Sequence, residues 1–284
     1  PWCAEGGQRA SKKGMTFPRS GKERLKGMGE RFDTAAMLTS ASPSVASTDR
    51  VLQVLAVLAQ HGRAMSASEL MQKTGLARST LYRQLGRLKD WGFVSEIDAC
   101  YAPGPLSLQL ALGFDLASNV MRVARPEMEA LSRQSHESVG LIVAVNERAV
   151  CLDMVDSPLS LRCSFEKGRS VPLRHGASAK CVLAHLPELQ RRAVLDMHHE
   201  PGSAEWREAD RALLAIREAG CATSAGEVDA GVWGASAPVF AAPRHAVGAI
   251  TLMAPISRVQ GQESALTQMT IVAAARISRQ LSPP

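Results

Sequence analysis

Apolar residues between positions 48 and 91 recur at the three-to-four-residue spacing of amphipathic helices. The first stretch follows a capping pair, Thr48 and Asp49, and ends at His61-Gly62. Its apolar positions are Val51, Val54, Leu55 and Leu58. The pattern predicts a first helix over 48–61.

A second helix is predicted to begin after Ser66, because Ser66 and Glu69 have the spacing of a capping box. It carries Leu70 and Met71, and it stops at Thr74-Gly75, since glycine readily adopts the left-handed conformation that ends helices.

A third helix, from about Ala77 to Asp90, is predicted to have one apolar and one basic face. Leu81, Leu85 and Leu88 fall at i, i+4 and i+7, so they share the buried side. The other side and its flanks carry hydroxyl and guanidinium groups that can donate to phosphates and base edges, with Gly86 permitting close approach. These candidate DNA-binding residues are Arg78, Ser79, Thr80, Tyr82, Arg83 and Arg87.

A hairpin is predicted after the third helix. Residues 93–97 form its first strand, 98–101 a turn leading to a return strand, and Pro103-Gly104-Pro105 closes the unit. Three helices, a glycine turn and a hairpin are typical of a winged helix-turn-helix, although a basic helix face can also be merely solvated. We predict that 48–104 binds a double-stranded DNA operator.

Residues 105–121 are predicted to form a linker helix that is apolar on much of its circumference. Such a surface needs a partner: one side can cover the winged domain and another a second subunit. Its apolar residues are Leu106, Leu108, Leu110, Leu112, Phe114, Leu116 and Val120.

Residues 122–284 mix helical and strand-like patterns. Strands are predicted at 139–145 and 149–155, joined as a hairpin across 146–148, and also at 159–165, 235–240 and 246–253. Helices are predicted through 125–131 and at 177–186, 187–197, 209–219 and 264–281. Hairpins framed by helices indicate an α+β fold with an antiparallel sheet.

Composition and charge add to this organisation. The chain has 284 residues, 45% of them hydrophobic, which suits roughly two domains. The net charge of +6 is concentrated early: 1–47 carry eight Lys and Arg against four acids, 48–104 seven against five, and 105–284 eighteen against eighteen. Positive charge at the predicted DNA reader suits phosphate attraction. Without a long apolar run or a signal-peptide pattern, we expect no membrane contact and a cytoplasmic location.

Residues 1–47 are rich in Gly, Ser, Lys and Arg without periodicity, so we predict a disordered basic extension. A basic arm that grips DNA is one alternative. Another is that natural translation starts inside it, at Met15, Met28 or Met37.

The six cysteines include no Cys-x-x-Cys pair and are interpreted as reduced and structural. The nearest approach to a metal site is His198-His199-Glu200, where adjacent side chains on a helix would point apart. We therefore predict neither a metal nor a cofactor.

Several motifs together resemble one family. Segment 75–85 reads GLARSTLYRQL and segment 172–184 reads PLRHGASAKCVLA. Farther on stand Glu227, Gly231-Val232, the triplets 237–239 (APV) and 248–250 (GAI), Pro255 and Arg258. In this order and spacing they resemble the IclR family of bacterial transcriptional regulators, over roughly 48–281.

The resemblance implies a winged helix-turn-helix, a linker helix and a GAF-like effector domain, assembled as homodimers or homotetramers. It also implies small metabolite effectors, often carboxylates or aromatic acids. Gly176, Ala177 and Ser178 open a predicted helix, so their amides and the helix dipole could hold a carboxylate beside Lys180.

Four further effector-binding positions are carried over from the family. They are Ser224, Gly234, Thr251 and Met253, where the family's keto-acid binders have Asp, Cys, Ser and Ser. The loss of polar groups, the room at Gly234 and the adaptable surface of Met253 suggest a larger or less polar effector, such as an aromatic or hydroxylated organic acid. In the wing, Ala102 and Pro103 replace the family's usual Arg and Leu, which weakens the case for a phosphate contact there.

Two other functions compete with an effector-responsive regulator. A cytosolic enzyme could use Cys181 as nucleophile with His175 and Asp153, but Cys181 lies in an apolar run without a catalytic signature, so it favours the core. A DNA-binding factor without a ligand would not need the long, hairpin-rich segment 122–281. We predict a regulator rather than an enzyme; its operator, its effector and the sign of its regulation stay open.

Overall fold

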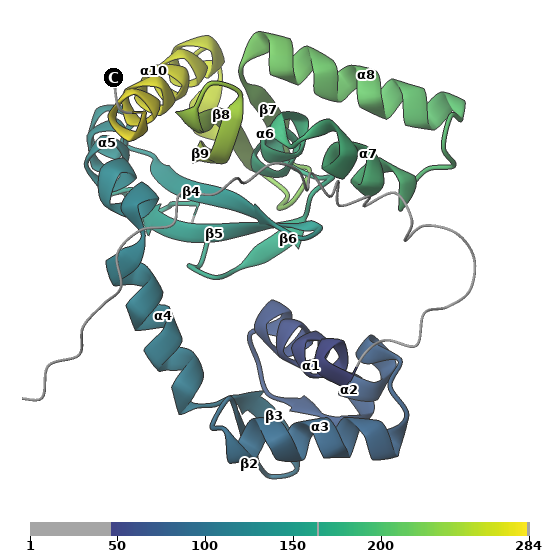
Figure 1. The fold of residues 1–284 in the computed structure, drawn as a ribbon. Coiled ribbons are helices and arrows are strands. Elements are labelled where there is room, and N and C mark those ends of the chain that lie inside the picture. The colour runs from purple at the N-terminus through teal and green to yellow at the C-terminus, as the bar shows by residue number, and fades with distance from the viewer. Residues whose placement is uncertain (1–46, 164, 283–284) are drawn as a thin grey trace, which may run out of the picture. The chain divides into compact units, whose positions relative to one another are not determined.

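The computed structural model describes residues 47–163 and 165–282 (Figure 1). Apart from Ser47, the predicted basic extension lies outside the described residues. The described chain comprises a three-helix unit with a small sheet, two consecutive helices, and a larger unit built on a second sheet. No helix in the described ranges is long and apolar enough to cross a membrane.

The three predicted N-terminal helices are confirmed as α1 (Ser47–His61), α2 (Ala67–Thr74) and α3 (Arg78–Asp90). Ser66 and Glu69 form the predicted capping box, and Gly75 ends α2 in the left-handed conformation, with φ of 67°. The predicted apolar stripes of the three helices meet in one core. Its members include Val54, Leu58, Leu70, Leu81, Leu85 and Leu88.

The wing is a three-stranded antiparallel sheet of order β1-β3-β2, from β1 (Met65–Ser66), β2 (Val94–Ile97) and β3 (Cys100–Pro103). The predicted turn over 98–101 is wrong in length. Asp98 and Ala99, with φ of 51° and 59°, make a two-residue turn, and Cys100 already belongs to β3. Because such a turn matches the twist of the strands, it keeps the hairpin tight.

The linker is divided at Ser118 into α4 (Pro105–Ala117) and α5 (Asn119–Ser135). The predicted single helix over 105–121 is therefore wrong at its C-terminal end. Ser118 is extended, with ψ of 98°, and its side chain accepts a hydrogen bond from the Met121 amide. A serine in this conformation is a helix N-cap, so it starts α5 instead of continuing α4.

The second sheet is antiparallel, as predicted, with six strands in the order β6-β5-β4-β9-β8-β7. The predicted strands at 139–145, 149–155, 235–240 and 246–253 are confirmed. The strands are β4 (Ser138–Val145), β5 (Arg148–Val155), β6 (Ser170–Pro172), β7 (Ala222–Ala225), β8 (Val232–Ala242) and β9 (His245–Pro255).

The strand predicted at 159–165 is absent from the described residues 159–163 and 165. Leu159 and Leu161 are 39% and 67% exposed, so no apolar face is buried there. Backbone groups of this segment bind side chains: the Leu159 amide donates to Ser157 Oγ and the Leu161 carbonyl accepts from Arg258.

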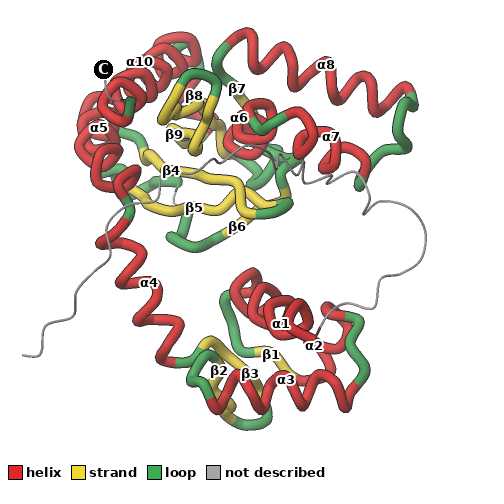
Figure 2. Tube along the Cα trace, in the orientation of Figure 1, coloured by secondary structure: helices red, strands yellow, loops and turns green. Residues whose placement is uncertain are grey.

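Helices cover both faces of the second sheet (Figures 1 and 2). Helices α5 and α10 (Glu263–Leu281) pack on one face. Helix α6 (Ala177–His185) packs on the other, with α7 (Glu188–Asp196) and α8 (Ala204–Ala219) outside it; the short α9 (Ile256–Val259) follows β9. Strand β4 shows the alternation, because Leu141 joins the first core and Ile142 the second.

Candidate nucleic-acid interface and ligand cavity

The turn between α2 and α3 is fixed by Thr74, which is only 7% exposed. Its hydroxyl donates to the Leu70 carbonyl at 2.7 Å and accepts from the Leu76 amide at 3.3 Å. Gln53 Nε2 of α1 donates to the Thr74 carbonyl at 3.0 Å. These bonds fix the turn that leads into α3, while the shared apolar core holds α3 itself against α1 and α2.

All six predicted DNA-binding residues lie on α3, and all except the half-buried Thr80 are exposed. The Arg78 guanidinium lies over the Tyr82 ring, 5.7 Å from its centroid. Within 47–163 and 165–282, Arg83 and Arg87 make no ion pair. The side chains are thus available to phosphates or base edges, and their contact with DNA stays a prediction.

Gln84 is a buried residue of α3 that the sequence interpretation passed over. It is fully buried, and neither its Nε2 nor its Oε1 has a hydrogen-bond partner among the described residues. Position 84 stands three residues after Leu81, on the same side of the helix. Helical spacing was therefore the signal that could have identified Gln84 as buried.

Two polar side chains of the wing, Tyr101 and Glu96, are hydrogen-bonded to each other, and Glu96 also binds α3. Tyr101, 4% exposed, donates to Glu96 at 3.1 Å, and Lys89 of α3 donates to the same carboxylate. Burial and the neighbouring Glu96 raise the pKa of Tyr101 to about 12. These groups stabilise the hairpin against α3.

The seven predicted effector-binding residues line a single cavity of about 70 Å³ between α6 and the strands β7, β8 and β9. They are Gly176, Ala177, Ser178, Ser224, Gly234, Thr251 and Met253. Six further lining residues were not assigned to the site from the sequence: Cys163, Phe165, Glu227, Val228, Asp229 and Val232. The sequence residues are brought together, while effector binding itself remains a prediction.

The groups expected to hold a ligand carboxylate at the start of α6 have partners within the chain. The Gly176 amide donates to Glu227 Oε2 at 3.0 Å, and the Ala177 amide donates to Ser224 Oγ at 2.9 Å. Lys180 Nζ donates to Glu227 Oε1 at 2.6 Å. Burial opposes ionisation of Glu227, but the bonds from Lys180 and Gly176 outweigh it and lower its pKa.

Residues 226–231 form a loop that lies against the start of α6. Gly226 and Gly231, with φ of 69° and 80°, bound the loop in conformations that favour glycine. A Cβ on Gly176 would stand 2.7 Å from Val228 Cγ2, so only glycine allows the loop this close. Asp229 of the loop forms an ion pair with Arg169, with 3.5 Å between its carboxylate and Nη2.

The floor of the cavity is polar at one point. Thr251 Oγ1 and the buried Ser236 Oγ are hydrogen-bonded at 2.9 Å. At Gly234 a Cβ would meet that of Ala177 at 3.6 Å, so the missing side chain leaves space beside α6.

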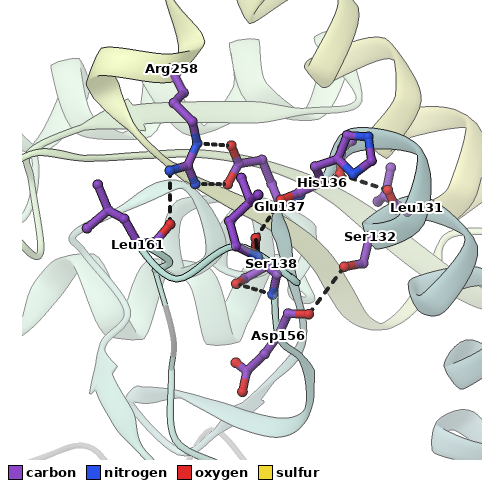
Figure 3. Close-up of polar contacts among 11 residues, drawn as sticks. Leu131, Ser132, His136, Glu137, Ser138, Asp156, Leu161 and Arg258 are labelled. Atoms are coloured by element: carbon purple, nitrogen blue, oxygen red, sulfur yellow. Dashed lines mark hydrogen bonds and ion pairs between the residues drawn. The ribbon is translucent and has the colours of Figure 1, made fainter.

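A polar network fixes the segment that leads to the cavity wall (Figure 3). Arg258 binds both oxygens of Glu137 at 2.6 Å and the Leu161 carbonyl at 2.9 Å. Glu137 immediately precedes β4 and its side chain is 6% exposed. The pair thus holds the segment whose next residues include Cys163, a lining residue.

The residues proposed for a cysteine nucleophile are unsuited to that chemistry here. Cys181 is fully buried, and burial raises the pKa of its thiol to about 12. The Asp153 carboxylate is bound by Arg125 at 3.2 Å. The described cysteines are free, and the described ranges hold no cluster of three His, Cys, Asp or Glu that could bind a metal.

Comparisons with known proteins agree in both halves of the chain. The IclR helix-turn-helix domain model matches 47–97, and the model of the bacterial transcriptional regulator IclR C-terminal domain matches 116–279. An HTH-type transcriptional regulator of Mycobacterium tuberculosis is 31% identical over 224 residues, which cover 76% of this chain and 85% of that protein.

Two solved structures share the fold. An IclR transcriptional regulator from Silicibacter sp. TM1040 matches with a TM-score of 0.73 and 23% identity, covering 84% of this chain and 98% of that one. An IclR homologue from Microbacterium hydrocarbonoxydans, complexed with 4-hydroxybenzoate, matches with a TM-score of 0.64 and 22% identity, covering 83% and 99%.

Proposed function

Because this chain belongs to the IclR family of DNA-binding transcriptional regulators, we propose that α3 reads an operator and that a small organic acid controls this binding. The protein acts in the bacterial cytoplasm, where operator DNA lies. The observation that carries the proposal is that seven sequence-chosen residues from α6, β7, β8 and β9, or next to them, line one cavity.

An organic acid suits the chemistry of this cavity. The start of α6 offers amides and a helix dipole to an anion, and the hydroxyls of Ser224 and Thr251 can orient polar substituents. The 4-hydroxybenzoate complex of the Microbacterium homologue supports an aromatic carboxylate. At about 70 Å³, however, the cavity is smaller than the roughly 150 Å³ that holds benzene in a protein core, so an aromatic ring requires the lining to move.

The regulator acts as a homodimer or a dimer of dimers. Helix α4 supports this proposal, because four large apolar side chains on it are about half exposed or more. They are Leu108, Leu110, Leu112 and Phe114. A second subunit that covers them would also bring two copies of α3 to one operator, which suits two half-sites.

Replacing Arg83 by Ala tests the DNA interface. We expect a loss of about 1–3 kcal/mol in operator binding free energy if Arg83 contacts a base. If Arg83 contacts a phosphate, the plot of log binding constant against log salt concentration should become less steep by about one. Fluorescence anisotropy over a series of salt concentrations, with DNA from upstream of the gene, measures both. Arg211→Ala, an exposed position on α8, serves as control. Unchanged affinity with an unchanged slope would refute the assigned contact.

A screen of aliphatic and aromatic carboxylic acids tests effector control. We expect at least one acid to raise the melting temperature and to change operator affinity, because a ligand that binds one arrangement better shifts the equilibrium. If every acid fails while operator binding is intact, the chain is a DNA-binding factor without a ligand of this class.

A further inference from the structure

We propose that Glu227 is a built-in competitor of the effector's carboxylate. In this mechanism, which rests on the proposed function, the acid takes over the Gly176 amide and the Lys180 ammonium, and the loop 226–231 leaves the start of α6. Displacement of Glu227 therefore requires an anion, and a neutral molecule of the same shape leaves Glu227 in place.

The contacts of Glu227 are those that a carboxylate in its place would make, since Gly176 lines the cavity and Lys180, which does not, is reached only where Glu227 now lies. One oxygen accepts from the first amide of the α6 N-terminus at 3.0 Å, and the other accepts from Lys180 at 2.6 Å. Both bonds are charge-assisted, and the helix dipole adds to them. Glu227 is therefore positioned as a tethered anion in a site built for one.

A second carboxylate cannot join Glu227 there at little cost. Two like charges that share the same donors repel, and one of them must be protonated or leave. The Glu227 side chain is 34% exposed, so it has a short path into water, where hydration replaces the bonds that it loses. Exchange of one carboxylate for the other keeps Lys180 paired throughout.

A neutral ligand cannot replace Glu227 as the anionic partner of Lys180. An amide or alcohol that displaced Glu227 would leave the Lys180 ammonium, whose side chain is 26% exposed, without its anionic partner. A neutral isostere is therefore expected to bind beside Glu227 without displacing it, so the loop stays on α6 and the cavity keeps its volume of about 70 Å³.

The loop that carries Glu227 can move as a unit, because its ends are the left-handed Gly226 and Gly231. Its movement must also break the packing of Val228 on Gly176 and the exposed ion pair between Asp229 and Arg169. When Glu227 leaves, Val228 leaves with it, and the space of both side chains is added to the cavity. This is the enlargement that an aromatic acid requires.

Glu227→Gln tests the competition, with acetate as the minimal carboxylate and acetamide as its neutral isostere. Gln keeps an acceptor for the Gly176 amide, so the loop is retained while the competing charge is removed. The backbone amide resonance of Gly176 in ¹H–¹⁵N spectra reports binding at the site. Melting curves verify that each variant is folded.

We expect Glu227→Gln to bind acetate about tenfold more tightly than the wild type, because the competing charge no longer repels the ligand. Acetamide should show no comparable gain. The control is Glu166→Gln, which removes an equal charge from an exposed position outside the lining. Equal or weaker acetate binding by Glu227→Gln, no acetate binding at all, or the same gain in Glu166→Gln would each overturn the proposal.

The outcome is separable from that of the proposed function. An acid that changes operator binding with equal affinity in the wild type and Glu227→Gln keeps effector control and refutes the competitor. A tenfold gain for acetate, with no acid able to change operator binding, keeps the competitor and refutes effector control.

Discussion

Gln84 contradicts the usual pairing of buried polar groups. Its amide lies inside the core of the helix-turn-helix without a hydrogen-bond partner among the described residues, although burial of an unpaired amide costs about 1–3 kcal/mol. No hydrogen bond of the Gln84 side chain to the described residues offsets that cost. The residue is therefore a place where stability can be gained.

We expect Gln84→Met to raise the free energy of unfolding by about 1–2 kcal/mol, because Met has a similar volume and no polar group to desolvate. Urea denaturation measures the change. The matched control is Gln72→Met at an exposed site on α2, which should alter stability little. A loss of stability at position 84 would mean that the amide has a stabilising role.

The residues of the cavity show what the sequence could and could not provide. The start of α6 and the positions on β7, β8 and β9 were assigned because motifs of a known family place them. Glu227 was visible only as a motif residue, since its bonds to Gly176 and Lys180 join positions 51 and 47 apart in the chain. Spacing does not encode such contacts.

At the scale of elements, periodic helices with caps were predictable and very short strands were not. Helix α2 has its capping box and its terminal glycine written in the sequence, and its bounds follow from them. Strands β1 and β6 have two and three residues, too few to show an alternation. The linker was divided because Ser118 caps α5, a local signal hidden in an apolar run.

Helix α4 leads to an expectation about assembly. Leu108 and Leu112 lie one turn apart on the helix and are 62% and 56% exposed. We expect the double substitution Leu108→Glu and Leu112→Glu to reduce the oligomer to a smaller species, because charge would be buried in the apolar contact. Light scattering coupled to size-exclusion chromatography gives the mass.

Leu189→Glu on α7 is the control, since Leu189 is 85% exposed and stands outside the linker. An unchanged mass in the α4 variant would show that other surfaces assemble the subunits. A monomeric wild type would contradict homo-oligomerisation altogether.

At the scale of the whole molecule, Glu137 and Arg258 join segments 121 positions apart. We expect Arg258→Met to lower the free energy of unfolding by about 2–3 kcal/mol, because a nearly buried carboxylate loses its partner while the exposed part of Arg258 moderates the effect. Chemical denaturation measures the loss.

The double variant Glu137→Leu with Arg258→Met should recover part of that loss, since no unpaired charge remains buried. Arg211→Met, which breaks the exposed pair with Glu208, should have little effect. Equal stability of wild type and Arg258→Met would show that the pair adds nothing to the fold.

The antiparallel character of the second sheet was predictable, because hairpin patterns join consecutive strands. The order of its strands was not, because β4 pairs with β9 through contacts distant in sequence. The strand predicted at 159–165 was wrong because burial also depends on contacts distant in sequence. Its leucines are apolar, but no neighbouring segment buries them.

The pairing of β4 with β9 also determines when the sheet can form during synthesis. Gly140 of β4 meets Thr251 of β9, so on the ribosome the sheet must wait until almost all of the second half has emerged. The core of the helix-turn-helix closes among α1, α2, α3 and the wing alone. A nascent chain can therefore complete its helix-turn-helix core before the sheet that carries the proposed effector cavity has formed.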